Sequence, residues 1–179
     1  MPKIKTNWSK ALKDWETLSP EDKVRRWHHN VEIDGEINTY QHFLKPLYAE
    51  MILRSVEVLS KNTARVVFEL DSSAYWSNAG GNVHGGAQAA IFDIVTTLAL
   101  APIARPGYWM YAGVSRTLNV TYLRPGPVGE KILIEAEVIH AGKSLAAIRG
   151  VMKRAKDGAV ISTCEHNKAS TDPEVRSKI

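Results

Sequence analysis

The sequence predicts an α+β domain in which a curved antiparallel sheet wraps around one long central helix, preceded by a helical N-terminal extension. Three observations lead to this prediction. One run, residues 87–104, is apolar almost all round, so a helix there needs cover on several sides. Two β-rich runs precede it and four follow it, and short turn-like links between them favour antiparallel hairpins. The first fifty residues instead carry large apolar side chains at helical spacing.

The helical extension is expected over residues 1–50. Its first helix is expected to bury one face formed by Trp8, Leu12, Trp15 and Leu18. The other elements expected after the second helix are a turn at residues 34–36 and a third short element at 40–51.

The second helix of the extension has a clear start signal in "SPEDKVRRWHH". Ser19 is the expected N-cap, Pro20 occupies the first helical position, and acidic residues fill the first turn. Val24 and Trp27 are then expected to face inward.

The sheet domain is expected over residues 51–171, with a C-terminal tail at 172–179. Its elements follow the order β-β-α-β-β-β-β along the chain. The strand-like runs are residues 52–59, 63–70, 113–123, 130–140, 144–155 and 159–169.

Composition narrows the class of protein. The 179 residues make about one domain, with 44% apolar and 23% charged residues, which are ordinary globular values. The single cysteine, Cys164, excludes an intramolecular disulfide and fits a reducing compartment. Polar residues interrupt the longest apolar run, so we expect a buried core helix and no membrane span.

The positive net charge suggests an anionic partner but does not identify it. The net charge is +4 and the pI is about 9.2. Nucleic acid is not expected, because there is no dense Lys/Arg run and no interleaved aromatic-basic motif. A small polyphosphate ligand is compatible with the same charge.

The two ends of the chain bear on compartment. We expect a cytoplasmic protein, since the basic N-terminus lacks the apolar segment of a signal peptide. The alternative is a peroxisomal protein, because Ser177-Lys178-Ile179 differs only in its final residue from the Ser-Lys-Leu address. A mitochondrial presequence is the weakest alternative, because acidic residues come early and arginine is absent there.

The apolar helix contains one charged residue, Asp93, and no basic partner on the same helix. Burying an unpaired carboxylate costs free energy, so Asp93 either bonds to polar groups in a seam or serves chemistry. A carboxylate held in an apolar wall is a common arrangement for a general base or nucleophile, which favours the second interpretation.

The start of the helix supplies a complementary group. Gly85 and Gly86 lie at its N-terminus, where N–H groups lack intrahelical partners and can polarise a carbonyl oxygen. These glycines could equally serve only the turn into the helix. Gly85 and Asp93 are eight residues apart, about 12 Å along a helix. One carbonyl group cannot touch both in one chain, so cooperation between them requires at least a dimer.

Three further residues are candidates by position. His84 and the amide Asn78 lie in the loop before the helix, where such residues are most often structural. Ser115 belongs to a polar set expected to alternate along one strand face: Ser115, Thr117, Asn119 and Thr121. That face is either solvated or presents a hydroxyl to a bound water.

Three segments together resemble the hotdog-fold acyl-CoA thioesterases, in the branch that includes phenylacetyl-CoA thioesterase and thioesterase superfamily member 2. The segments are "HGGAQAAIFDIVTTLAL", "GVSRTLNVTYLRPG" and "HAGKSLA". The resemblance covers about residues 50–170. It implies a hotdog fold and hydrolysis of an acyl-CoA to free acid and coenzyme A.

The resemblance also implies roles for individual residues. Asp93 would be the general base or nucleophile, and Ser115 would come from the same subunit. The Gly85 N–H would be the oxyanion donor of the other subunit, with His84 beside it. Asn78 would help place the water or the thioester.

The resemblance further implies where coenzyme A binds, as part of the substrate and without a separate cofactor or metal. Its phosphates would explain the positive net charge. The family favours a homodimer or a tetramer built as a pair of dimers. The implied coenzyme A contacts are Tyr122, Leu123, Arg124, Pro125, Gly126, His140, Gly142, Lys143, Ser144 and Lys168.

Two other functions are compatible with these residues. The first is a non-catalytic acyl-CoA sensor or carrier, since one fold hosts many functions. The second is an acyl-CoA hydratase or dehydratase. Such relatives pair an Asp with a His on one loop-helix unit, and Asp93 lies too far along the helix from His84 for that.

Overall fold

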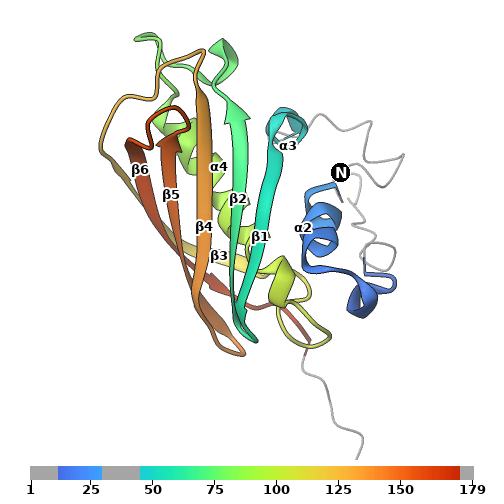
Figure 1. Cartoon of the computed structure of the whole chain (residues 1–179). Coiled ribbons are helices and arrows are strands. Elements are labelled where there is room, and N and C mark those ends of the chain that lie inside the picture. The colour runs from blue at the N-terminus through green and yellow to red at the C-terminus, as the bar shows by residue number, and fades with distance from the viewer. Residues whose placement is uncertain (1–11, 30–44, 174–179) are drawn as a thin grey trace, which may run out of the picture.

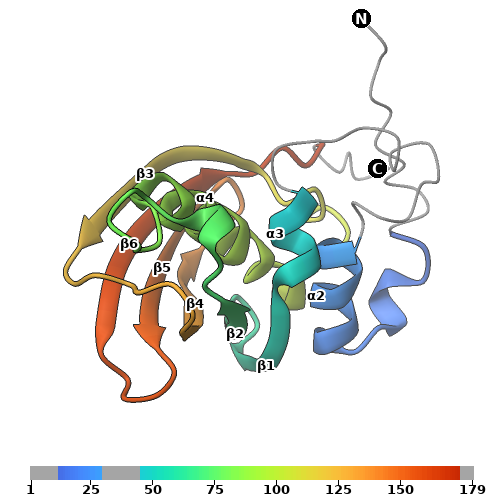
Figure 2. The same ribbon diagram turned by 90° about the horizontal axis from the view of Figure 1, so that it is seen from above.

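The computed structural model describes residues 12–29 and 45–173. In this part of the chain six strands form one antiparallel sheet in the order β1-β2-β4-β5-β6-β3, which curves around helix α4 (Figures 1 and 2). The fold and the order of elements predicted from the sequence are confirmed. The bounds are β1 Ile52–Ser60, β2 Thr63–Asp71, α4 Gly85–Leu98, β3 Val114–Tyr122, β4 Lys131–Ala141, β5 Leu145–Arg154 and β6 Val160–Ala169.

Helix α4 fills the concave side of the sheet. Ile91, Phe92 and Val95 are fully buried, and the helix contacts β2 to β6. Phe92 lies so close to the sheet because β5 carries Gly150 there. A Cβ at that position would stand 2.7 Å from the Phe92 ring. By length and composition Gly85–Ile103 could cross a membrane, yet 67% of this segment is buried inside the fold, as in a core helix.

The predicted second helix is confirmed as α2 (Pro20–His29). Ser19 caps it, because the Asp22 N–H donates to Ser19 Oγ at 3.1 Å and Ser19 Oγ donates to the Asp22 carboxylate at 2.6 Å. Val24 and Trp27 are buried, as expected. Helix α2 packs on β1 and on the short helix η4 (Ala101–Ile103), so it covers the β1 side of the sheet (Figure 2).

The predicted first helix is wrong in its described part. Residues 12–14 form a turn, Asp14 adopts a left-handed φ of 54°, and only a short 3-10 helix, η1 (Trp15–Thr17), follows. The reason is tertiary: Trp15 stacks on Trp27 with ring centroids 5.5 Å apart and donates its Nε1–H to the Ala104 carbonyl at 2.9 Å. These contacts fix the indole more strongly than helical spacing does.

Several expected elements fall outside the described residues. Trp8, the turn at 34–36 and the C-terminal residues 177–179 are among them. Of the third short element, the described part is helix α3 (Lys45–Glu50). Its Glu50 accepts a hydrogen bond of 2.7 Å from Trp76 Nε1, in the 3-10 helix η3 (Ala74–Trp76) that precedes the loop to α4.

The two edges of the sheet differ. Strand β1 has α2 packed against it, whereas β3 pairs with β6 on one side and with no described segment on the other. Val114 and Tyr122, at the two ends of β3, are each more than half exposed. Strand β3 is therefore an open edge, available for pairing with another chain.

Candidate functional site

The loop before α4 presents one free backbone donor. His84 is the N-cap, and its Nδ1 accepts a hydrogen bond of 2.9 Å from the Gly86 N–H. The Gly85 N–H makes no hydrogen bond to any residue of 12–29 or 45–173. This N–H lies at the positive end of a fourteen-residue helix and can donate a hydrogen bond to an anionic oxygen.

Asn78 organises the same loop. Its Oδ1 accepts hydrogen bonds from the N–H groups of Gly80 at 2.9 Å and Asn82 at 3.3 Å. The carboxamide oxygen is thus occupied by its own turn, while the amide NH₂ has no hydrogen-bond partner among the residues described. Only the amide nitrogen is left for a ligand.

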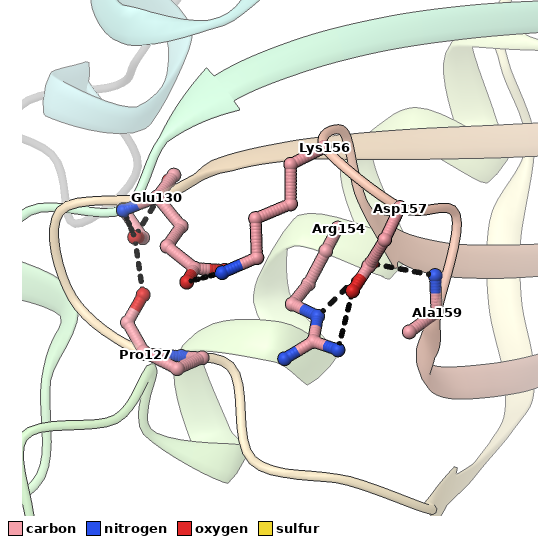
Figure 3. A network of polar contacts seen from close by, with 7 residues as sticks. Pro127, Glu130, Arg154, Lys156, Asp157 and Ala159 are labelled. Carbon is pink, nitrogen blue, oxygen red and sulfur yellow. Dashed lines mark hydrogen bonds and ion pairs between the residues drawn. The ribbon is translucent and has the colours of Figure 1, made fainter.

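The segment after β3 lies against this loop and is held firmly. The Val83 N–H donates to the Gly126 carbonyl at 2.8 Å. Ser72 Oγ lies 2.7 Å from the carbonyl oxygens of both Pro127 and Glu130. A network joins Glu130 to Lys156, and the neighbouring hairpin is closed by an ion pair between Arg154 and Asp157 (Figure 3). The first contact places Gly126 beside the loop that leads into α4, and the others hold residues 127–130.

Asp93 lies on α4 opposite the other end of β3. Ser115 Oγ donates a hydrogen bond of 2.7 Å to Asp93 Oδ1. The Asp93 side chain is 43% exposed, so the expectation of a carboxylate inside an apolar wall is wrong for the single chain. The reason is that α4 lies beside the open edge of the sheet at this point.

A β-bulge aims Ser115 at this carboxylate. Ser115 lies opposite Lys168 of β6 and Thr117 lies opposite Asn167, so the register shifts between Ser115 and Thr117. The shift turns Ser115 toward α4, whereas Thr117 bonds the outward-facing Asn167. The expectation that Ser115 and Thr117 share one strand face is therefore wrong.

Strand β6 supplies two basic groups that the sequence did not connect to Asp93. His166 Nε2 lies 3.5 Å from Asp93 Oδ1, and its Nδ1 lies 2.6 Å from Thr96 Oγ1. Lys168 Nζ donates to Thr97 Oγ1 at 2.9 Å and reaches Ser115 Oγ at 3.5 Å. The only sequence signal for the pair is their alternation with Cys164 along β6, which places all three on its inner face.

His166 is held neutral. Burial, and to a smaller extent the nearby Lys168 ammonium, lower its pKa to about 4 against the opposing effect of Asp93. A separation of 3.5 Å is an electrostatic contact and too long for a strong hydrogen bond. Thr96 Oγ1 donates its proton to the Phe92 carbonyl at 2.5 Å, so the tautomer consistent with that bond has Nδ1–H donating to Thr96 Oγ1.

Lys168, which the resemblance implies as a coenzyme A contact, is buried beside Ser115 and Thr97. It is 3% exposed, and burial lowers the pKa of its ammonium while Asp93 raises it. A buried ammonium between Thr97 and Ser115 belongs to the surroundings of Asp93, and it does not lie at an exposed strand end.

The structure separates the remaining candidates into two groups. Tyr122, Leu123 and Arg124 lie at the Gly85 end of β3. The hairpin between β4 and β5 lies at the Ser115 end, because Ala146 pairs with Lys168. Seven residues of strand, about 23 Å, separate these ends. The hairpin group comprises His140, Gly142, Lys143 and Ser144.

Metal-dependent chemistry and a cysteine nucleophile are not supported by the described residues. The described residues hold no group of three His, Cys, Asp or Glu side chains that could bind a metal ion. Burial raises the pKa of the Cys164 thiol to about 12, so it is not a nucleophile near neutral pH.

Known proteins match this fold and this loop. Residues 80–161 match the family model described as "Thioesterase superfamily". Acyl-coenzyme A thioesterase 13 from Homo sapiens is 32% identical over 119 residues, which are 66% of this chain and 82% of that protein. The chain belongs to the thioesterase superfamily. It is accordingly a thioester hydrolase.

Solved structures resemble this thioesterase over most of its length. Zebra fish thioesterase superfamily member 2 superposes with a TM-score of 0.69 and 25% identity, covering 85% of this chain and 98% of that one. A hypothetical thioesterase from Streptococcus pneumoniae, solved with coenzyme A, has a TM-score of 0.59 and 18% identity. That alignment covers 69% of this chain and 88% of the other, and at this identity it supports the fold alone.

Proposed function

We propose that this thioesterase hydrolyses acyl-CoA at a site shared by two subunits. One observation carries the proposal: a hydrogen-bonded carboxylate and a free helix-terminal N–H lie at opposite ends of the same open edge strand. Each chain thus holds both halves of a hydrolytic site, too far apart to act on one thioester. The names of the relatives support acyl-CoA as the substrate class.

A two-fold dimer would bring the halves together. If β3 pairs antiparallel with β3 of a second copy, the axis near the strand centre exchanges its two ends. The Tyr122 end of one chain then meets the Ser115 end of the other. This arrangement would place the Gly85 N–H of one subunit near Asp93 of its partner twice per dimer.

The residues of the completed site suggest a direct route. Asp93 would take a proton from a water molecule that Ser115 helps to orient, and the water oxygen would bond to the thioester carbon. The Gly85 N–H would stabilise the oxyanion, worth about 3 kcal/mol in comparable sites. When the oxyanion collapses, the carbon–sulfur bond breaks and the thiolate of coenzyme A leaves and takes up a proton.

The same dimer would also bring the two groups of coenzyme A contacts together. Arg124, at the Gly85 end, and Lys143, in the hairpin at the Ser115 end, are both exposed. Opposite subunits would contribute them to one site, where they would neutralise phosphates. The positive net charge of the chain supports a ligand of this anionic kind.

Subunit complementation tests the shared site. Gly85→Pro removes the proposed oxyanion N–H at the first helical position, where proline is tolerated. Asp93→Asn removes the base. Each variant alone should be nearly inactive toward a panel of acyl-CoAs, with thiol release as the readout. After co-refolding in equal amounts, about a quarter of wild-type activity should return, because half of the dimers carry one intact site.

The control and the contrary outcomes are clear. Gly85→Ala adds the same Cβ as proline but keeps the N–H, so it should retain far more activity than Gly85→Pro. Absence of any recovery, with mixed dimers shown to form, would place the whole site within one chain. Tight acyl-CoA binding without hydrolysis by the wild type would favour a sensor instead.

A further inference from the structure

The aromatic ring of Tyr122 packs directly on the first residue of α4. The Tyr122 hydroxyl donates a hydrogen bond of 2.9 Å to the Gly85 carbonyl oxygen, across 37 residues of sequence. A Cβ on Gly85 would stand 3.2 Å from Tyr122 Cζ and 3.3 Å from its oxygen. The ring therefore needs glycine at position 85 in order to lie this close.

The second glycine accommodates a second ring. A Cβ on Gly86 would stand 3.1 Å from Nδ1 of His84, the atom that accepts the Gly86 N–H. Neither Gly85 nor Gly86 has a positive φ, so backbone conformation does not require glycine at either position. The pair is explained by the two aromatic side chains that lie over it.

These contacts form one continuous chain of hydrogen bonds. The Gly85 carbonyl and the Gly86 N–H belong to the same peptide group. Tyr122 donates to one end of this peptide, and the other end donates to His84. Hydrogen bonds linked through a peptide polarise one another, so the Tyr122 hydroxyl strengthens the cap on His84.

The cap also fixes the proton on His84. Because the Gly86 N–H donates to Nδ1, that nitrogen carries no proton, and the neutral ring holds its proton on Nε2. The free Gly85 N–H and this Nε2–H then belong to one turn whose position depends on the Gly85–Gly86 peptide.

We propose that Tyr122 is a positioning residue for the reaction, which acts through the Gly85–Gly86 peptide on the Gly85 N–H and on the His84 ring. The inference rests on the proposed function of Gly85. It differs from the implied role of Tyr122 in gripping coenzyme A, because the hydroxyl is already bonded to the protein. A grip on coenzyme A would act on KM, whereas positioning acts on kcat.

Tyr122→Phe is the test, since it removes only the hydroxyl. We expect kcat for acyl-CoA hydrolysis to fall about tenfold with KM nearly unchanged, the size typical of one lost positioning hydrogen bond. Tyr75→Phe is the matched control. Tyr75 is 71% exposed near the same loop, and its hydroxyl has no hydrogen-bond partner among the described residues, so both kinetic constants should stay at wild-type values.

A spectroscopic readout separates this inference from the function itself. ¹⁵N NMR of the His84 ring should show the Nε2–H tautomer in the wild type and in Tyr75→Phe, and a mixture of tautomers in Tyr122→Phe. In a Gly85→Ala background, where the ring is already displaced, Tyr122→Phe should cost little more.

Each contrary result has a distinct meaning. A raised KM with unchanged kcat would overturn positioning and restore the contact with coenzyme A. An unchanged His84 spectrum in Tyr122→Phe would overturn the hydrogen-bond chain whatever the kinetics show. Hydrolysis at the wild-type rate by Asp93→Asn would contradict the proposed function. The ¹⁵N spectrum of His84 in Tyr122→Phe would still show whether the Tyr122 hydroxyl fixes the conformation of the turn.

Discussion

The two halves of the site are built in different ways. The glycine turn around Gly85 consists mainly of backbone groups held by neighbours in the loop and by one distant ring, Tyr122. The carboxylate cluster around Asp93 consists of side chains from α4, β3 and β6. The turn therefore depends on local geometry, and the cluster depends on the packing of three elements.

The halves also differ in charge. The cluster holds a carboxylate, a neutral imidazole 3.5 Å from it, and a buried ammonium that reaches Ser115 Oγ, the hydroxyl bonded to that carboxylate. The hydrogen bonds of the turn join only neutral groups when His84 is neutral. Substitutions in the cluster should therefore change rate and pH dependence, whereas substitutions in the turn should mainly change geometry.

The largest effect is expected at Asp93. Asp93→Asn keeps the shape of the side chain but removes the base, so kcat should fall about 10²–10⁴-fold in a thiol-release assay. Asp71→Asn is the control, because Asp71 is an exposed carboxylate at the end of β2 that pairs with Lys131 at 3.1 Å. Equal activity of the two variants would remove Asp93 from the mechanism.

The second effect concerns stability and comes from His166. Its pKa is about 4 in the folded chain against 6.5 for a free histidine, so between these values the unfolded chain binds more protons. Stability should then fall as pH drops from 6.5 toward 4, by up to about 3 kcal/mol from this residue. Urea unfolding at about pH 7 and about pH 4.5 should show the loss.

His166→Gln isolates this contribution. The variant lacks the imidazole, so its stability should change less between the two pH values than that of the wild type. Equal pH dependence of both proteins would mean that His166 titrates in the folded state much as it does in the unfolded chain.

A third, smaller effect distinguishes two roles for Lys168. If its buried ammonium supports Asp93 and Ser115, Lys168→Met should lower kcat about tenfold and leave KM nearly unchanged. Lys143→Met, in the exposed β4–β5 hairpin, should instead raise KM, with a weaker dependence of binding on salt. A raised KM in both variants would return Lys168 to the phosphate contacts.

The smallest effect is expected in the turn. Asn78→Ala removes the acceptor for the Gly80 and Asn82 N–H groups and should lower kcat/KM several-fold. Asn78→Asp keeps this acceptor but loses the amide NH₂. Recovery of activity in Asn78→Asp would show that Asn78 acts through its turn, and a deeper loss would show that its NH₂ contacts the substrate.

The sequence alone was sufficient for the sheet and the central helix, and it singled out the candidate residues of the turn. Six strand runs, the central helix and the cap of α2 were predicted because hydrophobic period and capping residues act over a few positions. His84, Gly85 and Asp93 stood out for the same reason, since their contrast with an apolar helix is visible along the chain. The prediction of an N-terminal helix through Trp15 was wrong, because the hydrogen bond from Trp15 to the distant Ala104 carbonyl determines the local conformation.

Only the tertiary structure decided what surrounds Asp93. His166 and Lys168 lie more than seventy residues from it in sequence, and β6 brings them to α4 through the strand order of the sheet. The bulge that turns Ser115 inward has no signature in a pattern of alternating residues. Sequence fixes which groups a strand carries on each face, but the pairing of strands fixes which of those groups meet, because pairing brings together residues that local periodicity cannot relate.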